Sequence, residues 1–466
     1  MSKVRKTTVA GFCLLGLLSG YGGQSAGPLR VSKDNPRYFA DPSGNVVYLT
    51  GSHTWDNLLD MGPADPPAAF DYPAYLDFMQ KHNHNFMRMW TWELASWNTA
   101  ANSQKRLHFV RPLVYARTGP GNALDGKPKF DLKKFDPEYF ERLRSRVVAA
   151  RDRGIYVSVM LFEGWGVQRI ADGWKGHPFN RENNVNGIDG DKDGDGKGLE
   201  IHELVVPAIT ALQETYVRKV IDTVGDLDNV LYEISNENHP ASTEWQYHII
   251  RFIHDYEKTK PKQHPVGMTF QYQGGKNSAL FGSPAEWISP NPEGGFRDNP
   301  PAWDGRKVVL NDTDHLWGTG GNSPWVWKSF ARGLNPILMD PYEGKVLEGK
   351  PESKWEPIRR SMGQTRRFAE RMNLAAMSPR NELASTSYCL ASPGREYLVY
   401  LPTSGTIEVD LSAASGQLAV EWFDPNKDAT ADGGTIEGGA RRSLKSPFSS
   451  DAVLYLKAPG PPRRKK

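Results

Sequence analysis

The stretch LYEISNENHP, residues 231–240, joins an apolar run to an abruptly polar end. Leu231, Tyr232 and Ile234 are residues that favour a buried β-strand. Asn236 and Glu237 follow at once, so an amide and a carboxylate stand where the strand ends. A solvated loop residue would explain Glu237, and so would a proton donor held in a cleft. The surrounding sequence decides between these two interpretations.

Seven more short apolar runs lie between residues 45 and 370 and alternate with helical patterns such as 136–153 and 202–226. In the first of these patterns Asp136 can cap a helix and Pro137 suits its first turn. Eight strand–helix units over about 300 residues predict an α/β fold, the closed (β/α)₈ TIM barrel. The alternative is an open doubly wound sheet, but no glycine-rich phosphate loop follows the first strand. The predicted strands are 46–49, 86–90, 155–161, 230–235, 266–270, 287–288, 308–310 and 336–339.

The pattern changes after about residue 374, where strand-like runs are separated by Gly, Pro, Ser and Asp turns. Runs at 397–401, 406–411, 418–423 and 452–456 predict a small antiparallel β-sandwich. We therefore expect a signal peptide at 1–26, a barrel at 27–373 and a sandwich at 374–460.

The N-terminus has the pattern of a secretory signal. Lys3, Arg5 and Lys6 precede an apolar run, 9–18, that is too short to span a bilayer. The expected location is therefore secreted or periplasmic, with Cys389 left as the single cysteine of the mature chain. The net charge of +3, from 57 basic and 54 acidic residues, favours neither nucleic acid nor a membrane surface as partner. We expect a monomer.

Chemistry in such a barrel lies at the carboxyl ends of the strands. Carboxylates, aromatic rings and amides gather at the predicted ends, which a random scatter of polar residues would not produce. These positions are the candidate site residues: His53, Trp55, Arg88, Trp90, Trp92, Glu163, Trp165, Asn236, Glu237, His239, Tyr272, Asp312, Asp314, His315, Trp317, Asp340 and Tyr342.

Two opposed carboxylates are the minimum for glycoside hydrolysis. We assign Glu237 as the proton donor, because a wall of tryptophans would raise its pKa by desolvation. Asn236 would hydrogen-bond the sugar hydroxyl beside the reacting carbon. The partner is Asp312 or Asp314, which lie two apart and would share a face of an extended chain. Asp312 comes first after the strand and is favoured as nearest the barrel mouth, and Arg88 is placed to keep the partner ionised.

These features resemble the clan A glycoside hydrolases, the cellulase and mannanase superfamily of TIM barrels. The Asn236-Glu237 pair and a strand-seven carboxylate carry the resemblance. Segments 38–41 and 51–55 are similar to the apiosidase-like members, in which the barrel is followed by a sandwich of the collagen-binding type. Residues 410–412 and 420–425 resemble that sandwich, which we expect to pack on the barrel and not to bind collagen. The motifs are short, although the resemblance covers nearly the whole mature chain.

Two positions depart from the pattern of the clan. Asn238 stands where cellulases usually carry proline, and the strand-seven candidates are aspartates where glutamate is usual. The resemblance implies a retaining mechanism with the strand-seven aspartate as nucleophile. Because aspartate is one methylene shorter, the separation of the carboxylates changes and inversion stays open as the alternative.

A second motif is DGDKDGDGKGLE, residues 189–200, which fits the calcium-loop pattern D-x-[DN]-x-[DN]-G-x₅-E. We expect a structural Ca²⁺ and no organic cofactor. Gly196 stands where such loops carry an aliphatic residue, and no helix precedes the motif, so a solvated turn is the alternative. The candidate ligands are Asp189, Asp191, Asp193, Asp195 and Glu200.

The sequence is therefore compatible with three functions. The first is a secreted glycoside hydrolase acting on plant or microbial polysaccharide, with an oligo- or polysaccharide as the binding partner. The second is a non-catalytic carbohydrate-binding or adhesion protein, which would need the tryptophans but not two opposed carboxylates. The third is a metal-dependent hydrolase using His53, His239 and His315, which no HxxH-type spacing supports.

Overall fold

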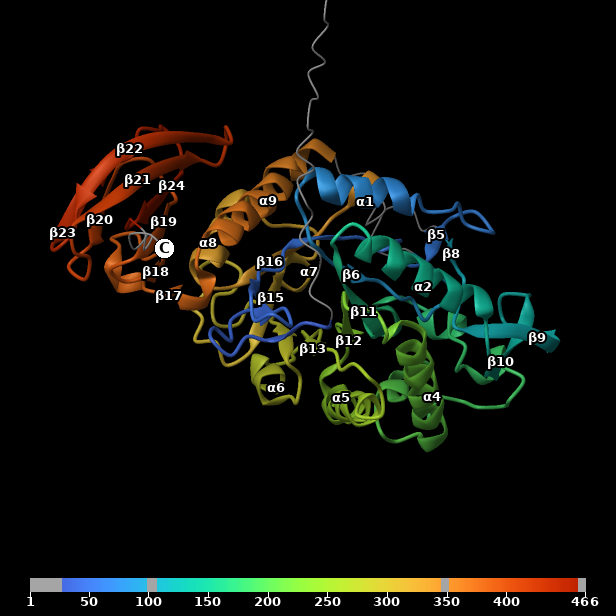
Figure 1. Ribbon diagram of the computed structural model, residues 1–466. Coiled ribbons are helices and arrows are strands. Elements are labelled where there is room, and N and C mark those ends of the chain that lie inside the picture. Colours follow the sequence, from blue (N-terminus) through green and yellow to red (C-terminus); the bar gives the residue numbers. More distant parts are fainter. Residues whose placement is uncertain (1–26, 99–106, 345–351, 460–466) are drawn as a thin grey trace, which may run out of the picture.

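The computed structural model describes residues 27–98, 107–344 and 352–459, so the signal peptide predicted at 1–26 lies outside the described residues. The larger part is a sheet of eight parallel strands that curls into a nearly closed barrel (Figure 1). This is the predicted TIM barrel. Its hydrogen-bonded order is β4 (Gly51–His53), β16 (Asn335–Met339), β15 (Val308–Asp312), β14 (Trp287–Ser289), β13 (Val266–Thr269), β12 (Val230–Asn236), β11 (Tyr156–Glu163) and β6 (Phe86–Met89).

The ring closes where β4 lies beside β6. The Thr50 carbonyl accepts the N–H of Asn85 at 3.0 Å just before the two strands begin. A Cβ added to Gly51 would stand 2.2 Å from the carbonyl oxygen of Phe86, so only glycine allows this approach.

The prediction for the first barrel strand is wrong. Val46–Val47 forms β3 of a small antiparallel sheet with β1 (Arg30–Val31) and β2 (Phe39–Ala40). The barrel strand is the next segment, Gly51–His53, which lacks aliphatic side chains and carries no apolar signal.

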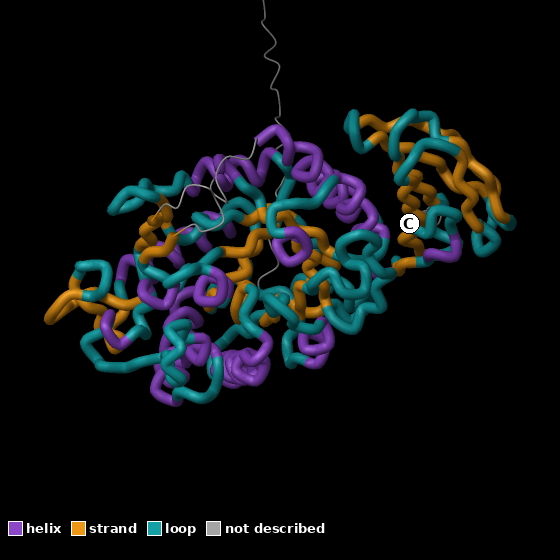
Figure 2. Tube along the Cα trace, turned by 180° about the vertical axis from the view of Figure 1, so that it is seen from behind, coloured by secondary structure: helices purple, strands orange, loops and turns teal. Residues whose placement is uncertain are grey.

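Helices cover the outside of the barrel, as the view from behind shows (Figure 2). The predicted cap is confirmed at α2 (Pro137–Arg151), where the Asp136 carboxylate accepts the N–H of Glu138 at 3.0 Å. The connection from β14 to β15, residues 290–307, is described throughout and holds no helix, which departs from the expected eight units. The helices are α1 (Tyr72–Lys81), α2 (Pro137–Arg151), α3 (Trp165–Arg169), α4 (Pro207–Val224), α5 (Thr243–Glu257), α6 (Asn277–Gly282), α7 (Thr313–Trp317), α8 (Ser323–Ala331) and α9 (Glu356–Arg371).

Short 3₁₀ turns connect several elements, and no helix of the described residues is long and apolar enough to cross a membrane. These turns are η1 (Gly173–Gly176), η2 (Arg181–Asn183), η3 (Leu199–His202), η4 (Pro240–Ser242), η5 (Tyr342–Gly344), η6 (Glu352–Trp355), η7 (Leu374–Ala376) and η8 (Asn381–Leu383).

Two further antiparallel sheets are formed by chain segments that come between β4 and α2 in the sequence. A three-stranded sheet has the order β5 (Asp60–Gly62), β8 (Leu107–Arg111) and β7 (Ser96–Asn98). The hairpin of β9 (Tyr115–Asn122) and β10 (Pro128–Phe135) projects from the end of the molecule opposite the C-terminal strands (Figure 1).

The C-terminal part is the predicted β-sandwich. A six-stranded sheet runs in the order β17-β18-β19-β24-β21-β22, and β20 pairs with β23. Cys389 is buried in this part, as expected for an inert thiol. The strands are β17 (Ser378–Pro379), β18 (Cys389–Ser392), β19 (Glu396–Leu401), β20 (Thr406–Asp410), β21 (Gln417–Asp424), β22 (Ala429–Glu437), β23 (Arg441–Lys445) and β24 (Ala452–Lys457).

The sandwich lies against α8 and α9 of the barrel (Figure 1). The contact is made by aromatic and aliphatic side chains of both parts. The Trp327 ring lies 5.6 Å from Phe368, 6.2 Å from Tyr400 and 5.9 Å from Phe423, measured between ring centroids. Such pairs contribute about 0.5–1.5 kcal/mol each beyond the area that they bury. The two parts are therefore joined by a shared apolar cluster.

Candidate active site

A pocket of about 640 Å³ opens at the carboxyl ends of the barrel strands. This volume falls within the range of about 300–1,000 Å³ that is typical of small-molecule sites. The lining combines aromatic side chains with polar and charged groups in similar number. The lining residues are Trp55, Trp90, Trp165, Arg169, Asn236, Glu237, Phe270, Tyr272, Pro292, Arg297, Asp314, His315, Leu316, Trp317, Gly318 and Met339.

Glu237 enters the pocket from a strained backbone. Strand β12 ends at Asn236, and Glu237 adopts a φ of 44°, a left-handed conformation that costs a non-glycine residue on the order of 1 kcal/mol or more. The loop is held by Gln168, whose amide donates to the Glu237 carbonyl at 2.7 Å. Asn238 donates to the Ser235 hydroxyl at 3.0 Å from the other side. The strain is therefore maintained by specific contacts, as is common at functional sites.

Asp312 and Asp314 meet at a single guanidinium but differ in access to the pocket. Asp312 is the last residue of β15 and caps α7, its carboxylate accepting the N–H of Asp314 at 3.0 Å. Arg88 Nη1 donates to Asp312 at 2.9 Å and to Asp314 at 3.0 Å. Asp312 is fully buried and does not line the pocket, whereas Asp314 does. The expectation that Asp312 lies nearest the mouth is therefore wrong, because the chain turns into a helix instead of staying extended.

Arg88 is the buried centre of this network. Its Nε and Nη2 donate to the Glu233 carboxylate at 2.8 and 2.6 Å, and Nη2 also donates to the Asn236 side-chain oxygen at 2.6 Å. The charge-assisted bonds fix the guanidinium in one orientation. Removing one partner of such a buried ion pair typically costs about 3–5 kcal/mol, because the remaining charge is then buried without compensation.

The carboxyl groups have widely separated pKa values. Burial raises the pKa of Glu237 well above its usual range, and the charge of Asp314 raises it further. Burial also raises the pKa of Asp314, to about 6, against the opposing effect of Arg88. Burial acts in the same direction on Asp312, but His53 and Arg88 outweigh it and hold the pKa of Asp312 below its usual range. Carboxyl groups whose pKa values are separated in this way are suited to act as an acid and a base.

Three predicted histidines each have separate hydrogen-bond partners. His53 Nε2 contacts Asp312 at 2.9 Å, and its Nδ1 accepts from Trp90 Nε1 at 2.7 Å. His315 Nδ1 contacts the Ser289 hydroxyl at 2.7 Å. His239 Nε2 contacts Glu203 at 3.0 Å and lies outside the pocket lining. The three rings do not converge on one point, so they do not form the histidine site of a metal-dependent hydrolase.

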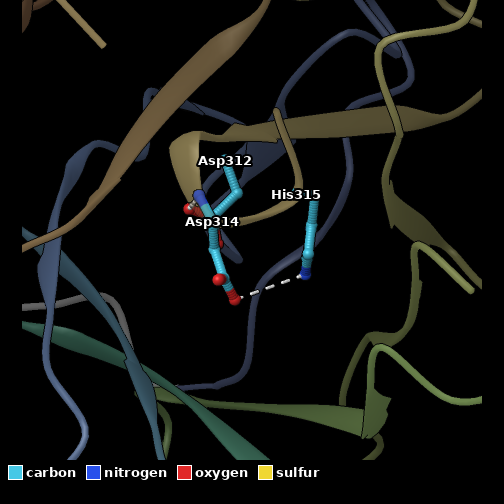
Figure 3. A group of neighbouring side chains, drawn as sticks. All are labelled: Asp312, Asp314 and His315. Carbon is cyan, nitrogen blue, oxygen red and sulfur yellow. Dashed lines mark hydrogen bonds and ion pairs between the residues drawn. The ribbon is translucent and has the colours of Figure 1, made fainter. Parts of the chain in front are cut away.

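Three neighbouring side chains in this region have the spacing of a metal site. Oxygen or nitrogen atoms of Asp312, Asp314 and His315 lie within 4.8 Å of one another, and Asp314 points toward His315 Nε2 at 3.7 Å (Figure 3). However, Arg88 Nη1 already donates to both carboxylates. A dication would have to share this space with a guanidinium, so the residues present do not favour a metal here.

Tryptophans form one wall of the pocket. Trp55 contacts Trp90 and Trp165 at centroid distances of 6.1 and 5.8 Å. Trp92 lies behind them, 5.2 Å from Trp55, and donates to the Trp55 carbonyl. The Trp55 Nε1 atom is buried and has no hydrogen-bond partner among the described residues.

Several predicted site residues lie outside the pocket lining. Glu163 is buried and accepts the N–H of Gly166 at 2.9 Å, and burial raises its pKa to about 8. Asp340 is ion-paired with Arg359 at 2.8 Å. The Tyr342 ring packs among the aromatic side chains of α1. The predicted residues that do not line the pocket are His53, Arg88, Trp92, Glu163, His239, Asp312, Asp340 and Tyr342.

Sequence reasoning missed Arg169 and Arg297. A sequence signal exists for Arg169, since a helix that begins at Trp165 returns to nearly the same face four residues later. Arg297 lies in the helix-free connection between β14 and β15, where no periodic pattern could place it.

The acidic motif brings together three of its five candidate ligands. Carboxylate oxygens of Asp191, Asp193 and Glu200 lie within 4.8 Å of one another. Asp189 instead accepts the N–H of Asp191 at 3.2 Å, and Asp195 pairs with Lys197 at 2.6 Å. This arrangement offers hard oxygen ligands of the type that Ca²⁺ prefers.

Comparisons with known proteins place the fold. Residues 108–273 match the family described as "Domain of unknown function (DUF6298)", and residues 378–457 match "Putative collagen-binding domain of a collagenase". No curated protein matches the chain.

Two solved structures share the whole architecture. One is described as "Glycoside hydrolase", with a TM-score of 0.60 and 12% identity, covering 93% of this chain and 97% of its own. The other is a glycoside hydrolase family 5 protein from Bacteroides vulgatus, with a TM-score of 0.58 and 12% identity, covering 93% and 94%. Both are glycoside hydrolases. At this identity the likeness establishes the fold, and its coverage includes the barrel and the sandwich.

Proposed function

We propose that the protein is an exported glycoside hydrolase that acts on plant or microbial polysaccharide by a two-carboxylate mechanism. One observation carries the proposal: Glu237, with a raised pKa, and Asp314, held by Arg88, line the same tryptophan-walled pocket. A protein that only bound sugar would need the aromatic wall but not this pair. The glycoside hydrolase neighbours agree with the proposal.

In the proposed mechanism Glu237 gives its proton to the leaving oxygen as the glycosidic bond breaks. Asp314 attacks the anomeric carbon and forms a glycosyl ester, and water then cleaves this ester after losing a proton to Glu237. In the inverting alternative, Asp314 instead takes a proton from an attacking water. Asn236 has its amide oxygen turned toward Arg88, which leaves its NH₂ to donate to the neighbouring sugar hydroxyl.

The test is a screen of the purified protein against plant and bacterial polysaccharides, with the released products measured by mass. New reducing ends with wild-type protein, absent with Glu237→Gln, would support the proposal. Binding without products for every polysaccharide would favour the carbohydrate-binding alternative.

The pH dependence follows from the same pair. Asp314 must be ionised to act, and its pKa is about 6, so kcat/KM should rise as pH increases through that value. Glu237 must stay protonated, and its raised pKa should place the fall in rate at still higher pH. We expect a bell-shaped profile whose acid limb lies near pH 6 and not near 4. Initial rates between about pH 4 and pH 9 measure it, and a rate independent of pH across the acid limb would contradict the assignment of Asp314.

We also propose that the loop 189–200 binds a structural Ca²⁺ through Asp191, Asp193 and Glu200. Oδ1 of Asp191 and Oε2 of Glu200 are buried without a hydrogen-bond partner among the described residues. The loop packs against η1, because a Cβ on Gly198 would stand 2.3 Å from the ring of Trp174, which belongs to the main apolar cluster. A bound cation would therefore hold this part of the connection between β11 and α4 in place.

We expect EDTA to lower the melting temperature and Ca²⁺ to restore it, since a ligand present at a hundredfold its Kd stabilises by about 2.7 kcal/mol. Magnesium should restore it poorly, because it dehydrates reluctantly. Joint replacement Asp191→Ala and Asp193→Ala should abolish the response to EDTA. Asp195→Ala is the matched control and should keep it, because Asp195 pairs with Lys197. If EDTA did not change the melting temperature of the wild-type protein, the loop would be a solvated turn without a bound ion.

A further inference from the structure

The charged groups around the pocket are unevenly distributed. Two arginines, Arg169 and Arg297, line it, and its only acidic lining residues among those described are Glu237 and Asp314. Both acids belong to the proposed reaction. The proposed mechanism gives no role to the arginines.

Arg169 lies beside the loop that carries Glu237. It ends α3, and the preceding residue, Gln168, donates to the carbonyls of Gly164 and Glu237 at 2.9 and 2.7 Å. The Arg169 guanidinium lies 5.6 Å from the ring centroid of Tyr272, across the pocket edge. No carboxylate of the described residues pairs with it, so its hydrogen-bond donors are available to a ligand.

Arg297 reaches the same pocket from the connection between β14 and β15. Its backbone is anchored through the preceding residue, since the Phe296 carbonyl accepts from Trp325 Nε1 at 3.0 Å. Among the described residues, the Arg297 guanidinium pairs with the carboxylate of its neighbour Asp298, at 3.2 Å, and both side chains are exposed. An exposed pair of this kind is weak and exchanges readily with an incoming anion.

We propose that the pocket selects an anionic sugar, one that bears a carboxylate or a sulfate ester, and that Arg169 and Arg297 bind this group. The inference rests on the proposed glycoside hydrolase function and names its substrate class. A guanidinium presents a fixed fork of N–H donors that matches the oxygens of such a group. The Tyr272 ring centroid lies 5.6 Å from the Arg169 guanidinium, and this cation–π contact helps to hold the guanidinium at the pocket.

The experiment compares matched substrates. Oligosaccharides from an acidic pectic polysaccharide are compared with the same mixture after reduction of its carboxyl groups, and sulfated galactan oligosaccharides with their desulfated form. We expect wild-type kcat/KM to be at least about tenfold higher on one anionic mixture than on its neutral counterpart, since charged hydrogen bonds give differences of this size. The mixture that shows the preference identifies carboxylate or sulfate as the group recognised.

Variants separate the arginines from the chemistry. Arg169→Gln should lower the ratio of kcat/KM on the preferred anionic mixture to kcat/KM on its neutral counterpart by about tenfold, with a smaller effect for Arg297→Gln. Arg251→Gln, an exposed arginine on α5, is the control and should behave as wild type. Equal activity of wild type on charged and neutral mixtures would overturn the inference while leaving the proposed function intact. Binding of all mixtures with cleavage of none would instead overturn the proposed function.

Discussion

Replacement of Glu237 by glutamine should lower kcat on unactivated glycosides by about 10²–10⁴-fold, because proton donation to the leaving oxygen is lost. Aryl glycosides with good leaving groups need little protonation and should lose much less. Initial rates on both substrate types measure the difference. An equal loss of rate on both substrate types would show that Glu237 is not the proton donor.

The same variant should fold at least as well as wild type. Glutamine has the shape of a protonated glutamate, and the raised pKa of Glu237 means that the native protein keeps this group protonated. The unfolded chain ionises it near its ordinary pKa, so wild-type stability falls as pH rises from there toward the native pKa. Melting temperatures of Glu237→Gln relative to wild type should therefore increase over this pH interval. Glu244→Gln, an exposed change on α5, should show neither effect.

The parts of the fold that the sequence predicted are those that apolar burial specifies. Strands β11 and β12 are buried along almost their whole length, and their aliphatic runs are plain in the sequence. Strand β4 could not be recognised, because Gly51, Ser52 and His53 are buried through polar contacts. The Ser52 carbonyl, for example, accepts the Tyr75 hydroxyl at 2.9 Å from a residue far along the chain. Such pairing depends on tertiary structure and leaves no local pattern.

The site was predictable where a strand end carries the residue, as at Asn236 and Glu237. Glu233 was missed, although a signal existed: Arg88 and Glu233 are charged residues inside apolar runs, and buried charges must pair. The order of Asp312 and Asp314 was misjudged because the spacing of two assumed an extended chain. The N-cap at Asp312 starts α7 and reverses which carboxylate faces the pocket.

Asp314→Ala should lower kcat on the order of a thousandfold, and azide or formate should restore part of the rate. The small anion can enter the space left by the carboxylate, which lies at the pocket surface, and attack the anomeric carbon in its place. The loss should be mainly catalytic, because Arg88 keeps its contacts with Asp312 and Glu233.

Asp312→Ala provides the contrast. This change removes the cap of α7, takes away one of the two carboxylates to which Arg88 Nη1 donates, and leaves the ring of His53 without its buried carboxylate. It should therefore lower the free energy of unfolding by about 3–5 kcal/mol, and azide should not restore activity because the vacated space does not line the pocket. Rates with and without azide, together with urea unfolding curves for both variants, distinguish the two aspartates. If azide restored Asp312→Ala and left Asp314→Ala inactive, the nucleophile would be Asp312, and Asp314 would serve to orient Arg88.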